Sequence, residues 1–255
     1  MRILTLARDL RRRKARERSD LFVAEGVRTL EELLASGLAI RGALVGPQLA
    51  QTPRGAALRA ALDARGVEVA EVSEREFASA ADTESPQGAL AIAEIPEREW
   101  GDVPSAPDGR VRVVVLDGVQ DPGNVGTILR TAAALGASAT AAMPGTVDVW
   151  NAKVVRSAMG AHFSHPAFPS SWDAFDRFRA ERGMSVWGAD AKGELLGQGV
   201  AAEDRLALVV GNEGAGLSAS ARARVDRLVS LPIVGVESLN AAVAVGILLY
   251  ELRPV

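Results

Sequence analysis

The sequence predicts an α/β protein in which a small α/β domain precedes a larger domain built on a mostly parallel sheet. Segments suited to strands alternate with segments suited to helices along both halves. Residues 96–109 place three prolines and two glycines among charged residues, the composition of an exposed linker. The run VRVVVL over residues 111–116 is short and β-branched, as in a strand buried on both faces of a parallel sheet. We therefore expect a first domain over residues 1–97, a linker over 98–109 and a second domain over 110–255.

Glycines bound the expected elements of the first domain. The helix expected over residues 24–36 ends at Gly37, and the helix over residues 56–65 ends at Gly66, because glycine readily adopts the left-handed conformation that closes a helix. The expected strands of this domain cover residues 40–45, 67–72 and 88–95. In the second domain the expected strands cover residues 110–116, 138–143, 184–189, 206–210 and 228–231. The expected helices there cover residues 125–135, 151–159, 172–181, 219–224 and 239–252.

The composition excludes several classes of protein. No run approaches the roughly 20 apolar residues that span a bilayer, and the first residues show no signal-peptide pattern. The 255 residues include no cysteine, which excludes disulfides, thiolate metal sites and cysteine nucleophiles. With 48% hydrophobic residues, the chain has enough apolar area for buried cores. We expect an ordered cytoplasmic protein that does not bind membranes.

Positive charge is concentrated at the start of the chain. The net charge is −3, yet residues 1–18 hold eight cations against two carboxylates, which gives +6 there and −9 elsewhere. Arg8, Arg12 and Arg16 recur at four-residue spacing, so a single helix would present them on one side. This basic face is either an ordinary solvated surface or a site that neutralises several phosphates. The candidate nucleic-acid contacts are Arg8, Arg11, Arg12 and Arg16.

The two histidines do not predict a metal site. His162 and His165 lie three residues apart just before Pro166, and no carboxylate or cysteine nearby in the sequence completes a ligand set. We expect no metal.

Three polar or glycine-rich segments of the second domain each join an expected strand to an expected helix, where open α/β sheets build ligand sites. They read LDGVQDPGNVGTILRTAAALGA (116–137), LVVGNEGAGLS (208–218) and LPIVGVESLNAAVAVGILLYEL (231–252). Taken singly, the first and third also fit structural roles, with Asn124 or Ser238 capping a helix. The glycine spacing of the second segment matches neither a dinucleotide-binding turn nor a P-loop.

In order and spacing, the three segments resemble the motifs of the SpoU family of RNA ribose 2'-O-methyltransferases, part of the SPOUT superfamily. NAKVVRSAMGA (151–161) resembles the family's segment between the first two motifs. FVAEGVRTLEELL (22–34) and ESPQGALAIAE (84–94) are similar to the small ribosomal-protein-like RNA-binding domain that precedes the catalytic domain in many members. The resemblance implies a second domain with a deep trefoil knot, an exception to the rule against knotted chains. It also implies S-adenosylmethionine as the cofactor, bound in the knotted loops.

Carried over to this chain, the resemblance implies two sets of site residues. The cofactor-binding residues would be Gly188, Gly211, Leu231, Ile233, Ser238 and Leu239. The catalytic candidates are Arg130, Asn124, Glu213, Ser238 and Asn240. In the family, the arginine of the first motif, here Arg130, is assigned to activating the ribose hydroxyl. A guanidinium is a poor general base, so we expect Arg130 to clamp the RNA phosphate and polarise the hydroxyl.

The other catalytic candidates are expected to act through position. Asn124 and Glu213 would orient Arg130 and the ribose, while Ser238 and Asn240 would shape the wall shared by cofactor and substrate. The resemblance also implies a homodimer that builds each active site at its interface.

The substrate and two competing classes stay open at this point. The appended first domain favours ribosomal RNA, with transfer RNA as the alternative. A non-catalytic RNA-binding protein would share the basic segment but would not bind S-adenosylmethionine. A nicotinamide-dependent dehydrogenase would fit a parallel sheet, yet the glycine fingerprint it needs does not follow residues 111–116.

Overall fold

A computed structural model describes residues 2–196, 203–236 and 238–253 of the chain. The chain forms two compact α/β units, so the predicted fold class is confirmed. The first unit comprises Met1–Glu97 and Trp150–Ser164, and the second comprises Arg98–Val149 and His165–Val255. The domain bounds expected from the sequence are continuous stretches of chain and stay a prediction. In the structure, residues 150–164 pack with the first unit, although they lie within the expected second domain.

The first unit contains a four-stranded sheet. In the order β1 (Leu21–Glu25), β4 (Ala89–Glu94), β2 (Ile40–Val45) and β3 (Val69–Glu71), β4 runs antiparallel to both of its neighbours, and β2 is parallel to β3. Val45 pairs with Ala89, and Glu25 pairs with Leu90. The carboxyl ends of β1 and β2 therefore lie at the edge of the sheet where the chain enters β4. We call this the carboxyl edge of the first sheet.

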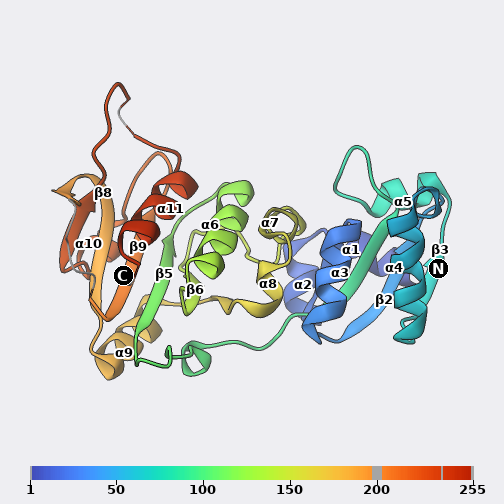
Figure 1. Ribbon diagram of the computed structural model, residues 1–255, viewed down its shortest axis with the longest axis horizontal. Helices are drawn as coiled ribbons and strands as arrows, with labels where there is room; N and C mark the ends of the chain where they lie inside the picture. Colours follow the sequence, from blue (N-terminus) through green and yellow to red (C-terminus); the bar gives the residue numbers. More distant parts are fainter. Residues whose placement is uncertain (1, 197–202, 237, 254–255) are drawn as a thin grey trace. The chain divides into compact units, whose positions relative to one another are not determined.

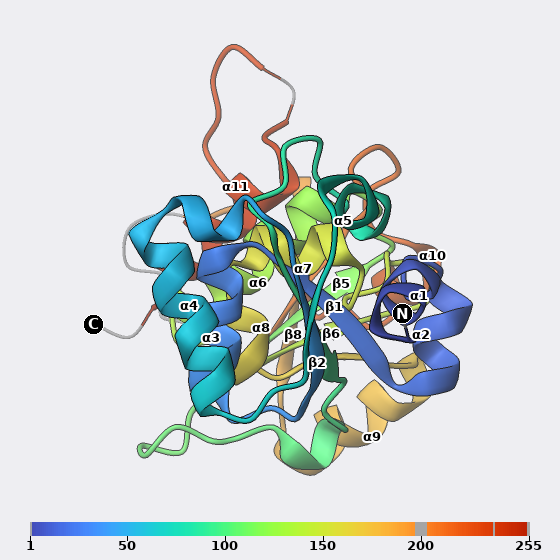
Figure 2. The ribbon, with the colours of Figure 1, turned by 90° about the vertical axis from the view of Figure 1, so that its right-hand side faces the viewer.

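Helices cover both faces of this sheet. Figure 2 shows the sheet between α3 (Val27–Ser36) and α4 (Pro53–Ala64) on one side and α1 (Arg2–Asp9) and α2 (Arg13–Ser19) on the other. In Figure 1, α3 and α4 lie side by side. The first unit also contains α5 (Glu74–Ala80), α7 (Ala152–Ala158), α8 (Ala161–Ser164) and a short 3-10 helix, η1 (Leu49–Gln51). The core beneath α1 joins Ile3, Phe77 and Leu90.

Two predictions for the first unit are wrong. Residues 24–36 do not form one helix, because β1 ends at Glu25 and α3 begins only after Gly26. The φ of Gly26 is 101°, which is not a helical conformation. The basic first segment forms two helices, α1 and α2, rather than one. At the break, the Arg16 guanidinium donates hydrogen bonds to the carbonyl oxygens of Leu10 (2.7 Å) and Arg11 (3.1 Å). Arg16 is therefore buried, at 3% exposure, and does not lie on the expected basic face.

The second unit contains a six-stranded sheet. Its order is β10 (Arg227–Ser230), β8 (Ser185–Leu195), β9 (Arg205–Gly211), β5 (Val111–Asp117), β6 (Ala139–Ala142) and β7 (Ala167–Pro169). Every neighbouring pair is parallel, as predicted, and β8, β9, β5 and β6 can be followed side by side in Figure 1. The short edge strand β7 was not predicted. Because β5 and β9 are adjacent and parallel, the loops that follow them emerge together at one edge of the sheet.

The helices of the second unit pack on both faces of its sheet. On one face, Phe175 and Phe178 of α9 (Trp172–Arg182) join the core with Val113. Elsewhere, α6 (Pro122–Ala134) packs against α11 (Ala241–Glu251), and α10 (Ala219–Arg222) is a single turn. Within the described residues, no helix is both long and apolar enough to cross a membrane.

Part of the expected linker belongs to the core of the second unit. Trp100, in the 3-10 helix η2 (Trp100–Asp102), stacks on Phe178 at 4.5 Å between ring centroids, and its Nε1 donates to Ser170 Oγ at 2.7 Å. Trp100 and Val103 are both buried. The expectation that residues 98–109 form an exposed linker is therefore wrong for these two side chains.

Candidate active site

The loops that follow β5 and β9 are fixed to each other by side-chain hydrogen bonds. The Asp117 carboxylate accepts hydrogen bonds from the Ser218 amide (2.6 Å) and hydroxyl (2.9 Å). The Asn212 side-chain amide donates to the Gly118 carbonyl oxygen at 2.9 Å. Asp117 and Gly118 come directly from the end of β5, so the first two motif segments form one structural element at this edge of the sheet.

Glu213 lies at the centre of this element. Its carboxylate accepts hydrogen bonds from the backbone amides of Gln120 and Asp121, both at 3.3 Å, and from Asn124 Nδ2 at 3.0 Å. Burial raises the pKa of Glu213, but the hydrogen bonds from Asn124 and from backbone amides favour the charged form, and the net pKa lies below its ordinary value. Glu213 is therefore an anionic acceptor near neutral pH.

Asn124 joins all three motif segments. Its Nδ2 donates to Glu213, and its Oδ1 accepts a hydrogen bond from Asn240 Nδ2 at 2.9 Å. The N-cap of α6 is Asp121, whose carboxylate accepts from the Asn124 backbone amide at 2.7 Å. The alternative in which Asn124 caps this helix is therefore wrong, and its side chain lies within the network. We call Asn124, Glu213 and Asn240 the motif network.

The cap of α11 also differs from the expectation. Asn240 Oδ1 accepts from the backbone amides of Ala242 (2.9 Å) and Val243 (3.3 Å), so α11 begins at Ala241. Ser238 is not the cap. One asparagine thus caps the helix and holds the motif network at the same time.

A pocket of about 770 Å³ lies beside the motif network and includes Glu213 and Asn240 in its lining. Of the expected cofactor residues, those that line it are Gly211, Leu231, Ile233, Ser238 and Leu239. Gly188 does not line it. It is buried in β8, one residue before the lining residue Ala189, and a Cβ atom there would lie 2.8 Å from Leu217 Cδ1.

Gly211 is required by the close approach of two backbones. A Cβ atom at this position would lie 2.3 Å from the carbonyl carbon and oxygen of Gly216. The loop folds back tightly, because Asn212 and Gly216 exchange backbone hydrogen bonds of 3.0 and 2.9 Å. This fold leaves polar backbone at the pocket wall.

Residues 111–250 match the family model of the SpoU rRNA methylase family, which covers more than half of the chain. The chain belongs to the SpoU rRNA methylase family. Residues 4–91 match a second family model, the MRM3-like substrate binding domain. The resemblance of the three motif segments to this family is thereby confirmed.

Relatives of this SpoU methylase match between two thirds and nearly all of its length. It is 34% identical to the 23S rRNA (guanosine(2553)-2'-O)-methyltransferase RlmP of Bacillus subtilis, over 96% of this chain and 93% of that protein. It is 35% identical to the 23S rRNA (uridine(2479)-2'-O)-methyltransferase of Streptomyces viridochromogenes, over 66% of this chain and 60% of that one. The crystal structure of an AdoMet-bound rRNA methyltransferase from Sinorhizobium meliloti superposes with a TM-score of 0.83 at 31% identity, covering 98% of this chain and 94% of that chain.

Arg130 lies apart from the pocket lining in this SpoU methylase. It is an exposed residue of α6, six positions after Asn124, and the pocket lining does not include it. The structure thus brings together Asn124, Glu213 and Asn240, with Ser238 in the pocket wall, while Arg130 lies further along α6.

Three charged pocket residues were missed by the sequence analysis. Asp190, Lys192 and Arg222 line the pocket, and Arg222 Nη2 donates to Asp190 Oδ2 at 2.5 Å. The Lys192 backbone amide and the Arg222 guanidinium hold the pKa of Asp190 below its ordinary value. For Asp190 and Lys192, a position just after the strand expected over residues 184–189, where ligand sites form in parallel sheets, was the available signal.

The expected RNA contacts of the first unit have different surroundings. Arg8, Arg11 and Arg12 are exposed. Arg8 Nε donates to Ser79 Oγ at 2.8 Å, and Arg12 pairs with Asp9 at 2.5 Å across a solvated surface. Arg16 is buried at the break between α1 and α2, and its guanidinium is directed to backbone carbonyl oxygens. The prediction that Arg16 contacts RNA is therefore wrong.

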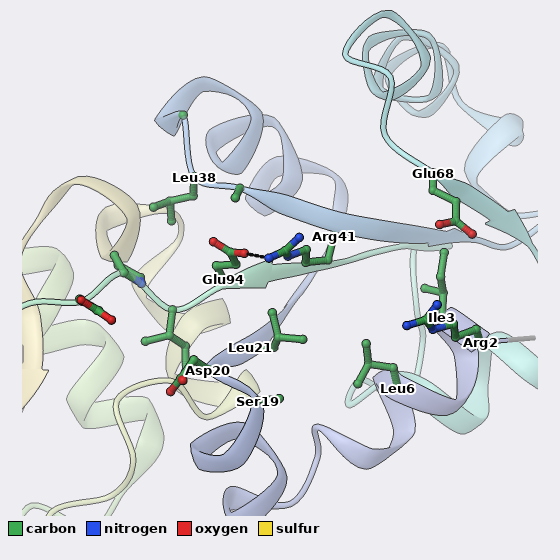
Figure 3. Close-up of a pocket in the computed structure, with 15 residues that line it drawn as sticks. Arg2, Ile3, Leu6, Ser19, Asp20, Leu21, Leu38, Arg41, Glu68 and Glu94 are labelled. Atoms are coloured by element: carbon green, nitrogen blue, oxygen red, sulfur yellow. Dashed lines mark ion pairs between the residues drawn. The ribbon is translucent and has the colours of Figure 1, made fainter.

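The first unit also contains a pocket of about 790 Å³ near the start of β2 and the end of β4. Figure 3 shows Arg41 and Glu94 directed toward each other there from neighbouring strands. The lining includes four carboxylates, Asp20, Glu68, Glu94 and Glu97, against two guanidinium groups, Arg2 and Arg41. This excess of negative charge disfavours an RNA phosphate.

The histidines lie in different units. His162 belongs to the first unit and His165 to the second, and both are buried. In the part of the chain that the structure describes, no group of three or more histidine, cysteine, aspartate or glutamate side chains is placed to hold a metal ion.

Proposed function

We propose that this chain is an S-adenosylmethionine-dependent methyltransferase that methylates a ribose 2'-hydroxyl of ribosomal RNA. The observation that carries the proposal is the motif network. Asn124, Glu213 and Asn240 come from three separated segments and meet beside one pocket. Relatives at 34% and 35% identity are named as 23S rRNA 2'-O-methyltransferases.

The pocket fits the cofactor in size and chemistry. Its volume of about 770 Å³ lies within the range of small-molecule sites, roughly 300–1,000 Å³. Adenine is neutral and needs apolar walls with a few backbone donors and acceptors. Leu231, Ile233 and Leu239 would supply the walls, and the backbone near Gly211 would supply the polar contacts. S-adenosylmethionine, when bound, supplies a methyl group on a positively charged sulfur.

The residues around the pocket would align the ribose rather than take its proton. The low pKa of Glu213 makes its carboxylate a weak base, so its role is to hold Asn124 through the hydrogen bond between them. Arg130 would clamp the adjacent RNA phosphate and polarise the 2'-hydroxyl, since a guanidinium donates hydrogen bonds but does not accept protons. Ser238 and Asn240 would form the wall between cofactor and ribose.

The first unit would bind the RNA. The supporting observations are its match to a substrate binding domain and the exposed Arg8, Arg11 and Arg12. Lys14 lies in the first turn of α2, where the helix dipole disfavours positive charge, so helix stability does not explain it. The compartment proposed is the cytoplasm, where bacterial ribosomal RNA is made and modified.

A homodimer is proposed on the exposed face of α11. Val243, Ile247 and Tyr250 follow the helical period on one side of this helix and are 51%, 39% and 51% exposed. Large apolar side chains in such a stripe are suited to a subunit interface. The trefoil knot expected from the family stays part of this proposal.

The test is a binding and transfer experiment. Calorimetric titration with S-adenosylmethionine would show one site per chain. Tritiated methyl transfer to separate pools of ribosomal and transfer RNA would then label the ribosomal pool. A folded protein that binds no S-adenosylmethionine would contradict the proposal, and labelling of the transfer RNA pool alone would replace its substrate.

A further inference from the structure

Cations from two distant parts of the sequence converge on one loop of the first unit. The loop covers residues 79–87, begins in the last turn of α5 and leads into β4 at the carboxyl edge of the first sheet. One group of cations comes from α1 and the turn after it, and the other comes from α7, which lies between the first two motif segments in the sequence. We call residues 79–87 the edge loop.

Arg8 and Arg11 border the start of the edge loop. Arg8 Nε donates to Ser79 Oγ at 2.8 Å, and Arg11 Nη1 donates to the Ser79 carbonyl oxygen at 3.5 Å. Both acceptors are neutral oxygen atoms, so these hydrogen bonds do not neutralise the positive charge of either guanidinium. Both side chains are exposed, which leaves them available to an anion in solution.

Arg156 contacts the same loop from α7, and Lys153 lies one turn earlier on that helix. Arg156 Nη1 pairs with Asp82 Oδ2 at 3.1 Å, three residues along the loop from Ser79. Lys153 lies three residues before Arg156 on α7, so the two share one side of the helix. Lys153 is exposed, and among the described residues its ammonium group has no carboxylate partner.

The edge loop is held in place by a buried carboxylate. Glu25 is 5% exposed and accepts hydrogen bonds from the Asp82 backbone amide, at 2.7 Å, and from the Thr83 hydroxyl. At the end of the loop, Gln87 Oε1 accepts from the Val27 amide at 3.0 Å. The loop with which Arg8, Arg11 and Arg156 interact is therefore itself held in place, which lowers the entropy lost on binding.

The charges around the loop favour an anion. Four cations border the loop, against three carboxylates: Asp82, which pairs with Arg156, the exposed Glu84 within the loop, and Glu76, whose pKa Arg8 helps to lower. Within the part of the chain that the structure describes, Arg11 and Lys153 form no ion pair with a carboxylate. Lys153 also lies in the first turn of α7, where the helix dipole disfavours a cation, so helix stability does not account for it.

We propose that the edge loop, bordered by Arg8, Arg11, Lys153 and Arg156, is a contact surface for the phosphate backbone of the substrate RNA. The inference rests on the proposed function and names the surface that binds its substrate. Lys153 and Arg156 thereby act in RNA binding although they lie within the part of the sequence that matches the methylase family model. Spacing of fixed cations along one loop suits a phosphate chain, for which charge and position matter more than base identity.

The test compares two double variants that remove the same charge. Arg11→Ala/Lys153→Ala changes the edge loop. Arg41→Ala/Arg65→Ala removes two exposed cations near the opposite edge of the sheet. Arg41 lies at the start of β2, and Arg65 lies before β3. Affinity for total ribosomal RNA is measured by filter binding over a series of KCl concentrations, and thermal melting shows that both variants are folded.

The salt dependence decides the outcome. Each lost phosphate contact reduces the magnitude of the slope of log K against log[KCl] by about 0.7–0.9. The edge-loop variant removes two cations, so the magnitude of its slope should fall by about 1.4–1.8, while the control keeps the wild-type slope. Equal slopes for the two variants would overturn the proposal. Failure of the function itself is distinguishable, because wild-type protein would then transfer no methyl group to RNA, and calorimetry on all three proteins monitors S-adenosylmethionine binding separately.

Discussion

Asn240 Nδ2 donates a hydrogen bond to Asn124 Oδ1 at 2.9 Å, joining the start of α11 to the first turn of α6 across 116 positions of sequence. The same Asn124 donates to Glu213 at 3.0 Å. A short side chain with one donor group and one acceptor group is suited to this position, because one neighbour is a carboxylate and the other an amide donor.

Asn124→Asp should break the motif network with the smallest change of shape. The new carboxylate would face Glu213 and lose the donated hydrogen bond, which is worth about 1.5–3 kcal/mol when the acceptor is charged. We expect kcat to fall by about 10- to 150-fold, with a smaller change in S-adenosylmethionine affinity because Asn124 does not line the pocket. Steady-state kinetics and calorimetry measure the two effects.

The control for this variant lies on the same helix. Thr127→Ala changes an exposed residue of α6 outside the network and should keep kcat within about twofold of the wild type. Equal losses in the two variants would mean that the helix, and not the network, had been disturbed.

Gly211→Ala should disrupt the tightly folded loop that forms the pocket wall. The added methyl group would lie 2.3 Å from Gly216 backbone atoms, and backbone cannot move aside as a flexible side chain can. We expect a loss of about 1–3 kcal/mol in the free energy of unfolding and a large loss of S-adenosylmethionine binding. In Gly214→Ala the nearest atom is Asn212 Oδ1 at 3.7 Å, so this matched variant should bind as the wild type does. Similar binding by both variants would contradict the argument.

His165 should make the second unit less stable in acid. It is 6% exposed, its Nε2 lies 2.9 Å from Thr140 Oγ1, and burial lowers its pKa to about 4 from an ordinary value of 6.5. Between these two values the unfolded chain binds more protons than the folded chain, so this contribution to stability is complete above about pH 6.5 and falls as the pH drops. The loss should reach about 2 kcal/mol between pH 7 and pH 5.

Urea unfolding at several pH values measures this effect. His165→Gln keeps a hydrogen-bonding group and removes the titration, so its free energy of unfolding should fall by about 2 kcal/mol less than that of the wild type over the same range. Parallel curves for the two proteins would show that His165 does not titrate differently in the folded state.

Arg16→Met should destabilise the first unit without affecting the pocket. The guanidinium satisfies the carbonyl oxygens of Leu10 and Arg11 at the break between α1 and α2, and hydrogen bonds from a charged group contribute about 1.5–3 kcal/mol. The exposed Arg18→Ala should cost less than about 0.5 kcal/mol. Differential scanning calorimetry compares the two, and equal melting temperatures would contradict the structural role of Arg16.

The sequence was most informative where local pattern and tertiary structure agree. The strand over residues 40–45 was predicted with the bounds that the structure shows, because its apolar run fits a buried strand. The helix over residues 24–36 was wrong in its first residues. Ala24 and Glu25 favour a helix by propensity, and only pairing with β4 places them in a strand.

The site was predicted as a set of residues but not as a network. Sequence order brings Asn124, Glu213 and Asn240 together only through the family resemblance, since the hydrogen bonds that join them depend on strand order. Asn240 rather than Ser238 caps α11, because side-chain caps of similar propensity lie two residues apart there. The burial of Arg16 could not be predicted, because arginine side chains are mostly exposed in folded proteins.

The most direct test of the central claim is the chemical position of the methyl group. Ribosomal RNA incubated with S-adenosylmethionine and either wild-type protein or Arg130→Ala is digested to nucleosides and analysed by mass spectrometry. The account predicts that wild-type protein adds one methyl group to a ribose, and that Arg130→Ala reduces the rate by about 10²- to 10³-fold while binding S-adenosylmethionine normally. Methylation of a base, or an unchanged rate for Arg130→Ala, would contradict it.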